Sequence, residues 1–308
     1  MDRDQWGVVL DAVKRAARAV AKDSPRGRRP RFADWLVVAM YLWAVAHDRC
    51  QSWACDRRHY GGAFRPRGKL PSVSQFNRRV AGERTRRVLR AVHEELAGDL
   101  TATALSYLDG KPLTVGVASK DPEAARGHVM GGFAKGYKLH AWMTEDRRVP
   151  LWCVTPLNVH EVPVARLMVE QVSELPERSL TLADQNYDAH DLHKELDARN
   201  GRLLVNPKGP KGPKGGTKRR HPVTLRLMGP ARRELIELKD RSPALLRTVM
   251  RQRVNAEGIL GNLCGCGGGL TGLPPWVRRL RRVRRWVGGK IILYHAKLRV
   301  RRAAKRAA

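Results

Sequence analysis

Acidic residues are scarce in this chain of 308 residues, which has 29 aspartates and glutamates against 60 lysines and arginines. The formal net charge is +31, and no acid follows Glu257. Self-repulsion on that scale is unusual for an enzyme of small neutral molecules and favours a polyanionic partner. The composition therefore predicts a protein that faces nucleic acid.

Cysteines and long apolar runs are also few, and each shortage argues against a class of protein. Five cysteines, an odd number, do not form a disulfide framework and indicate a reducing compartment. The longest apolar run, residues 35–46, is too short for a membrane span and suits a buried helix. The first residues show no signal-peptide stretch. We therefore expect a soluble cytoplasmic protein associated with the nucleoid.

Apolar residues nevertheless make up 42% of the chain, which is enough for a sizeable core. Two domains are expected at this length, and the residue pattern changes near position 100. We predict an all-helical, DNA-binding domain over residues 1–100. The second domain is expected over residues 101–308, with a basic insert at 206–222 and basic helices at its end.

Apolar periodicity predicts helices throughout residues 1–100, including one that Ser72 or Ser74 can cap. Several arginines follow this cap, among them Arg78 and Arg79. Their grouping on short helices is compatible with a helix-turn-helix-like module in which Arg78 and Arg79 contact DNA. A helical bundle with an arginine-rich polar face explains the same pattern, so both alternatives stay open.

The insert at residues 206–222 contains three consecutive Pro-Lys-Gly units. Proline and glycine at this density prevent a helix or a central strand, so we expect an exposed loop. In one interpretation Lys208, Lys211 and Lys214 contact DNA phosphates. In the other the segment is a solvated linker, and composition alone does not separate the two.

From about residue 101 the pattern changes to strands that alternate with helices. The order, with three successive strands first, predicts an α/β fold with a mixed sheet flanked by helices. Toward the end of the chain, Gly288 and Gly289 interrupt an apolar stripe and favour a break between two helices. The expected strands cover residues 105–110, 137–143, 149–155, 180–184 and 202–206, and the expected helices cover residues 162–175, 190–199 and 243–264.

Two aspartates come directly after apolar stretches of the predicted strands. Asp109 follows LSYL and Asp184 follows LTLA. A carboxylate at the end of a core strand loses hydration unless a cation or hydrogen-bond donors stabilise it. Glu257 is a third candidate, because steps of three and four place it on one helical face with Met250 and Arg253.

Three carboxylates from two strands and a helix would form a hard-oxygen site suited to Mg²⁺ or Mn²⁺. Two such ions, roughly 4 Å apart, activate a hydroxyl and stabilise the leaving oxygen in phosphoryl transfer. Arg253 would then hold a phosphate or orient Glu257. Each acid also has a plainer interpretation. Asp109 fits a turn, Asp184 fits a helix approach, and Glu257 fits an ordinary ion pair.

Several segments together resemble DDE transposases of bacterial insertion sequences. Residues 182–188 (LADQNYD) are similar to the motif around the second catalytic aspartate, with Asn186 where glycine is common. Residues 136–140 (GYKLH) and 157–163 (LNVHEVP) are similar to the strand and pre-helix signatures of that family. Downstream, residues 253–257 (RVNAE) match its Arg-x₃-Glu element. The resemblance extends over roughly residues 105 to 298.

The resemblance implies a ribonuclease-H-like catalytic core and metal-dependent DNA strand cleavage and joining. By position, Asp109, Asp184 and Glu257 become the catalytic triad that holds two Mg²⁺ or Mn²⁺ ions, and Arg253 becomes a DNA contact. The implied partner is double-stranded DNA, both the inverted repeats at the ends of the element and the target. A homodimer in the synaptic complex is also implied, because two ends must be held together.

Two departures from the longer signature Tyr-x₂-Arg-x₃-Glu-x₆-Lys favour a different function. Met250 occupies the tyrosine position and Cys264 the lysine position. The alternative is a catalytically inactive DNA-binding protein derived from a transposase. A ribosomal type of RNA-binding protein explains the charge but not the acids after the strands.

Two other kinds of site have weaker support. A zinc site has suitable ligand types, but their spacing is irregular and buried cysteines explain the pattern better. The chain also lacks the phosphate-binding loop of nucleotide hydrolases, so dependence on ATP has no support. The zinc-like residues are His47, Cys50, Cys55 and His59.

Overall fold

The computed structural model describes residues 2–23, 30–100, 103–207, 229–265, 269–270 and 272–307. Most of the insert predicted at residues 206–222, including Lys208, Lys211 and Lys214, lies outside these ranges. None of the helices in the described ranges combines the length and the apolar character that a membrane crossing requires. The division into domains at residue 100 stays a prediction.

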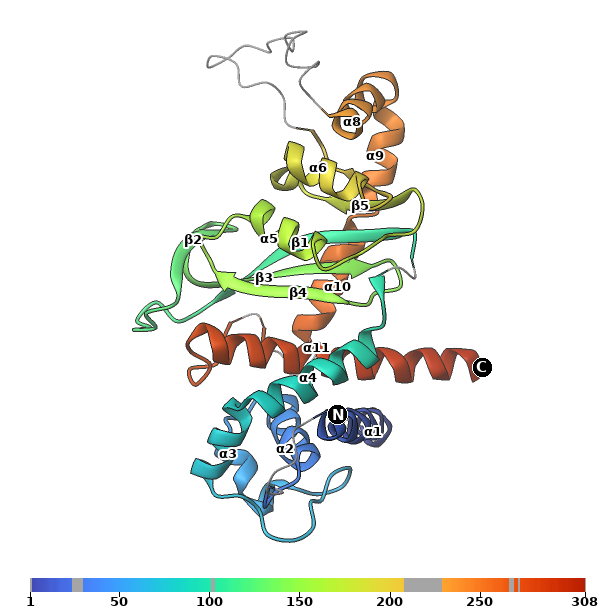
Figure 1. Ribbon diagram of the computed structural model, residues 1–308. Coiled ribbons are helices and arrows are strands. Elements are labelled where there is room, and N and C mark those ends of the chain that lie inside the picture. The colour runs from blue at the N-terminus through green and yellow to red at the C-terminus, as the bar shows by residue number, and fades with distance from the viewer. Residues whose placement is uncertain are drawn as a thin grey trace.

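A six-stranded mixed sheet forms the middle of the molecule (Figure 1). Strand β1 pairs antiparallel with β3 and parallel with β5, while β6 adds a second parallel pairing to β5. Strands β2 and β4 both pair antiparallel with β3. The strands are β1 (Leu105–Thr114), β2 (Ala125–Val129), β3 (Gly132–Thr144), β4 (Leu151–Pro156), β5 (Ser179–Ala183) and β6 (Gly201–Leu204).

Helices cover both faces of this sheet, because successive strand residues point to opposite sides. Leu108 and Trp142 belong to a core cluster with apolar residues of α5 (Glu161–Val169) and α6 (His190–Asp197). Tyr107, the neighbour of Leu108, belongs to a second cluster with residues of the C-terminal helices. The predicted mixed sheet flanked by helices is confirmed, and the arrangement is consistent with a ribonuclease-H-like core.

The N-terminal region is helical, as the periodicity predicts. Ser72 caps the third helix, since its side chain accepts a hydrogen bond from the backbone N–H of Gln75 in a capping box. This helix ends before Gly82, where the chain turns before it continues helically. The helices are α1 (Arg3–Lys22), α2 (Asp34–Ala46), α3 (Val73–Ala81) and α4 (Glu83–Ala97).

Two elements were not expected from the sequence. Strand β2 has a polar and glycine-containing sequence, and it forms because it folds back onto β3 through the turn at Gly131. Helix α8 (Pro230–Arg241) follows the insert, starts with proline in its first turn and packs on α6.

The expected helix over residues 243–264 is broken. It forms α9 (Pro243–Arg251) and α10 (Val254–Gly265), with a turn at Gln252 and Arg253. The two halves have different partners, because α9 packs on α8 whereas α10 packs on β1 and α11. The prediction that Met250 shares one continuous helical face with Glu257 is therefore wrong.

The expected break at Gly288 and Gly289 is also wrong, because α11 (Leu280–Ala307) is one continuous helix. Figure 1 shows it between the sheet and the N-terminal helices, and it contacts α1, α2, α4 and β4. A Cβ atom on Gly288 would lie 3.0 Å from the Trp152 ring, and one on Gly289 would lie 3.1 Å from Val45. The two glycines let neighbouring elements approach the helix closely.

This packing predicts opposite effects of substitution at two helical glycines. Gly289→Leu should lower the free energy of unfolding by about 1–3 kcal/mol, since overpacking exceeds the gain in helix propensity. Gly261→Leu in α10 should be neutral or stabilising by up to about 1 kcal/mol, because nothing lies within 4 Å of its Cβ position. Urea denaturation of both variants checks this, and equal destabilisation would contradict the packing argument.

Candidate active site

Asp109 and Asp184 follow residues that pair across neighbouring parallel strands. Leu108 of β1 pairs with Ala183 of β5, and each aspartate is the next residue. Paired strands lie about 4.8 Å apart and paired side chains point to the same face, so the two carboxylates lie next to each other. The expectation that Asp109 ends its strand is wrong, because β1 continues to Thr114 along β3. Only its pairing with β5 ends there.

Glu257 lies in the first turn of α10, which packs on β1. Asn255 of this helix donates a hydrogen bond to the Tyr107 hydroxyl at 3.2 Å. The Arg253 guanidinium, in the turn before α10, lies 3.8 Å from the Asp109 carboxylate and 3.4 Å from that of Glu257. Arg253 therefore links these two acids, which are far apart in the sequence.

The turn that follows β5 fixes the Asp184 carboxylate. One of its oxygens accepts the backbone N–H of Asn186 at 2.7 Å, and the other accepts the Asn186 side-chain amide at 3.3 Å. Asn186, which replaces the more common glycine, thus stabilises the aspartate directly. Asp184 remains partly accessible to solvent at the edge of the sheet.

The groups around the buried Asp109 carboxylate do not fully offset its loss of hydration. Burial raises the pKa of Asp109 to about 6, and the negative charges of Asp184 and Glu257 act in the same direction. The Gly110 N–H, which donates to Asp109 at 2.9 Å, and Arg253 lower this pKa but do not offset the burial. The side chain of Asp109 is only 15% exposed, against 62% for Glu257. The site therefore favours an added cation.

Three further residues around the site were not predicted. Lys138 and Glu161 form a mostly buried ion pair at 2.5 Å, and a Cβ atom on Gly110, which faces the side of β1 opposite to Asp109, would lie within 3.8 Å of both side chains. The buried Tyr187 has its pKa raised by burial and by the charges of Asp109 and Glu161. The only sequence signal was their place in the family-like segments, where they had no assigned role.

The donor chemistry of the site fits a hard divalent cation, since carboxylate oxygens are preferred by Mg²⁺ and Mn²⁺. The arrangement is not that of a complete ligand shell. In the part of the chain that the structure describes, no group of three or more His, Cys, Asp or Glu side chains is placed to hold a metal ion. Arg253 is the cation that contacts both Asp109 and Glu257.

The other predicted DNA contacts differ in their surroundings. Arg78 is exposed on α3. Arg79 forms an ion pair at 2.5 Å with the mostly buried Asp34 and so ties α3 to α2. Contact of either arginine with DNA stays a prediction.

A buried ion pair holds the chain just after the Asp184 turn. The fully buried Asp188 carboxylate accepts two hydrogen bonds at 2.8 Å from the Arg232 guanidinium on α8. The His193 ring contacts the same carboxylate at 3.3 Å. This pair connects the segment that carries Asp184 with the helix that follows the insert.

A match to a known protein family agrees with the transposase resemblance in the sequence. The family described as "Transposase DDE domain" matches residues 105–294, which include all six strands and the three carboxylates. A comparison with curated proteins gives no match. Among solved structures, the chain is similar to the "piggyBac transposase synaptic complex with hairpin DNA", with a TM-score of 0.47 and 10% identity. That similarity covers 94% of this chain and 71% of the other.

The raised pKa of Asp109 predicts a pH-dependent stability in buffer without divalent cations. Between its ordinary value of 3.8 and about 6 the folded protein binds more protons at Asp109 than the unfolded chain, so stability falls as the pH rises. Asp109→Asn should therefore be more stable than the parent by up to about 3 kcal/mol at pH 8. Denaturation at pH 8 and pH 4 checks this, and a gain that persists at pH 4 would contradict the assignment.

The buried pair predicts a large effect of removing one partner. Arg232→Met should lower the free energy of unfolding by about 3–5 kcal/mol, because it leaves the Asp188 charge buried. The double variant Asp188→Asn/Arg232→Met should recover part of this loss. Arg241→Met on the same helix is the control, since Arg241 is 80% exposed and should change stability by less than about 1 kcal/mol. Equal losses in Arg232→Met and Arg241→Met would contradict the role of the pair.

Proposed function

This chain belongs to the transposase DDE domain family, and we propose that it is a transposase of the kind found in bacterial insertion sequences. In this proposal it binds the inverted repeats at the two ends of its element and cleaves and rejoins the DNA strands there. One observation carries the proposal. The parallel register aligns Asp109 with Asp184, and Arg253 links Asp109 to Glu257.

The proposed catalytic residues are Asp109, Asp184 and Glu257. The DDE family uses divalent metals, and the three carboxylates are the side chains that would hold Mg²⁺ or Mn²⁺ here. A pair of such ions held there would supply activation of an attacking hydroxyl and stabilisation of the leaving oxygen of a phosphodiester. The shortage of positive charge around Asp109 supports cation binding at this place. Cations on the carboxylates would free Arg253 to bind a DNA phosphate.

Double-stranded DNA is the proposed partner, and the net charge of +31 supports it. The proposed contacts include Arg78 on α3 and Lys208, Lys211 and Lys214 in the insert. Arg79 is proposed as a contact through the part of its side chain that the Asp34 ion pair leaves exposed. A homodimer is proposed because one complex has to hold two ends.

A second candidate is a DNA-binding protein that no longer cleaves. Cys264 is buried in the core, so the lysine position of the longer signature does not present a side chain to DNA. Met250 likewise offers neither a hydroxyl nor a charge. In this alternative the binding of DNA remains strongly dependent on salt, and no metal supports cleavage.

Conservative substitutions of the acids separate the two candidates. Asp184→Asn and Glu257→Gln should each lower Mg²⁺-dependent cleavage at least about a thousandfold, because each removes a metal-binding charge. The affinity for DNA should change less than about threefold. Glu177→Gln is the control, since this exposed glutamate lies before β5, at the opposite end of the strand from Asp184.

The assay uses DNA from both sides of the reading frame, with cleavage measured on gels and affinity by fluorescence anisotropy. Full cleavage by either acid variant would overturn the assignment of the triad. A parent protein that binds this DNA but does not cleave it with Mg²⁺ or Mn²⁺ would favour the second candidate.

A further inference from the structure

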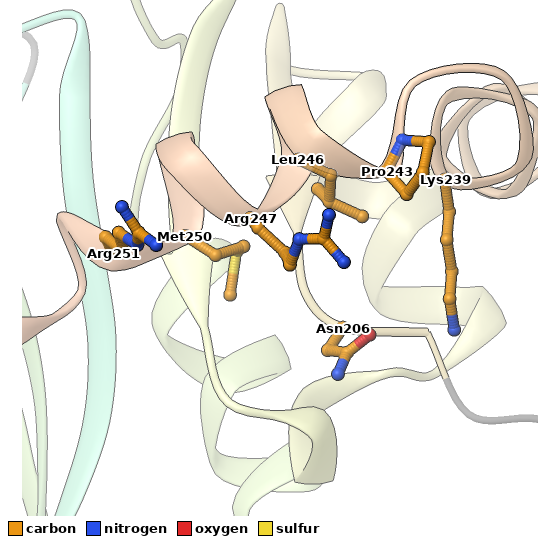
Figure 2. A pocket seen from close by; sticks show the side chains of 7 residues that line it. All are labelled: Asn206, Lys239, Pro243, Leu246, Arg247, Met250 and Arg251. Atoms are coloured by element: carbon orange, nitrogen blue, oxygen red, sulfur yellow. The ribbon is translucent and has the colours of Figure 1, made fainter.

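A pocket of about 520 Å³ lies where the chain leaves β6, and it is walled by α8 and α9. Figure 2 shows Lys239, Arg247 and Met250 extending from the two helices toward the side where Asn206 lies. Its volume is in the range of pockets that hold small ligands. The carboxylate site does not use these side chains.

The strand register places Asn206, which lines this pocket, at the same end of the sheet as Asp109 and Asp184. Leu182 of β5 pairs with Leu204 of β6, and Asp184 and Asn206 each follow two residues later. Asp109, Asp184 and Asn206 therefore follow corresponding positions on three neighbouring parallel strands, β1, β5 and β6. Ligands of such sheets bind outside the carboxyl ends of the strands, so one ligand can reach both places.

The charges around the pocket favour an anion. Lys239, Arg247 and Arg251 line it, and no acid is among the lining residues. Arg247 and Arg251 are four residues apart on α9 and thus share a face of that helix. Neither arginine has an acidic partner among the residues that the structure describes. Lys239 donates only a long hydrogen bond, at 3.4 Å, to the carbonyl of Pro207.

The remaining walls suit something larger than a simple anion. Leu246 is buried and Met250 is half-buried, so both offer an apolar surface with a polarisable sulfur at one position. The Asn206 amide supplies a donor and an acceptor. The cations suit a phosphate, the apolar wall suits the flat face of a base, and the amide suits the polar edge of that base.

We propose that this pocket binds one nucleotide of the DNA strand next to the phosphate that is cleaved. Arg247 and Arg251 hold its phosphate, the base lies against Met250 and Leu246, and Asn206 contacts the base edge. This assignment rests on the proposed function, since it takes DNA as the ligand. It also gives a role to Met250, because an apolar side chain suits the wall of a base pocket.

The test uses NMR on the full chain labelled with ¹³C-methyl methionine, which introduces one labelled methyl group at each of its seven methionines. Met250→Leu identifies the Met250 signal. The probe is the duplex used for the cleavage assay, added without divalent cations. The Met250 signal should shift on binding, both in the parent and in Asp184→Asn.

A double variant tests the arginines. Arg247→Gln/Arg251→Gln should bind the duplex about tenfold more weakly or worse and should lose the Met250 shift at saturation. Arg301→Gln/Arg306→Gln removes the same charge at the far end of α11 and should keep the shift (Figure 1). A thermal melt confirms that each variant is folded.

The outcomes separate this proposal from the proposed function. If the parent binds the duplex but the Met250 signal does not shift, the pocket proposal is overturned and the proposed function is not. A shift that survives in Arg247→Gln/Arg251→Gln overturns the role of the arginines. A Met250 shift without any cleavage in Mg²⁺ supports the pocket while the catalytic proposal fails. No binding by the parent overturns both.

Discussion

The parallel pairing of β5 with β1 on one side and β6 on the other is the constraint on which the site depends. Parallel strands end at the same edge of a sheet, so residues that follow equivalent positions meet there. The register brings Asp109 next to Asp184 and places Asn206, two residues after β6, at the same end of the sheet. A slip of one residue in either pairing would turn these side chains to the opposite face.

Burial makes the negative charge of Asp109 at this edge of the sheet energetically unfavourable. The carboxylates repel one another, and Asp109 has lost most of its hydration, so the fold has to supply positive charge nearby. Arg253 does this for Asp109 and Glu257. Stability and the capacity to bind a cation therefore depend on the same small region.

The basic side chains of this highly charged protein do not all have the same role. On α11, Arg281 and Arg285 donate to the last carbonyls of α3, and Arg284 donates to the carbonyl of Val154. These arginines join the helix to its neighbours, as Arg79 joins α3 to α2. Arg247 and Arg251, by contrast, line an open pocket. Net charge predicts the class of partner, but only the contacts separate structural cations from those available to DNA.

The sequence by itself determined the helical N-terminal region, the mixed sheet and the acids that follow apolar stretches, because these depend on local periodicity and on desolvation. It did not determine β2, the turn at Arg253, or the continuity of α11 through Gly288. β2 depends on its pairing with β3 across a tight turn, while the other two depend on partners distant in the chain: β1 for α10, and Trp152 for the glycine. Tertiary structure likewise decided which cations face Asp109 and which line the pocket, since ion pairing acts through space and not along the sequence.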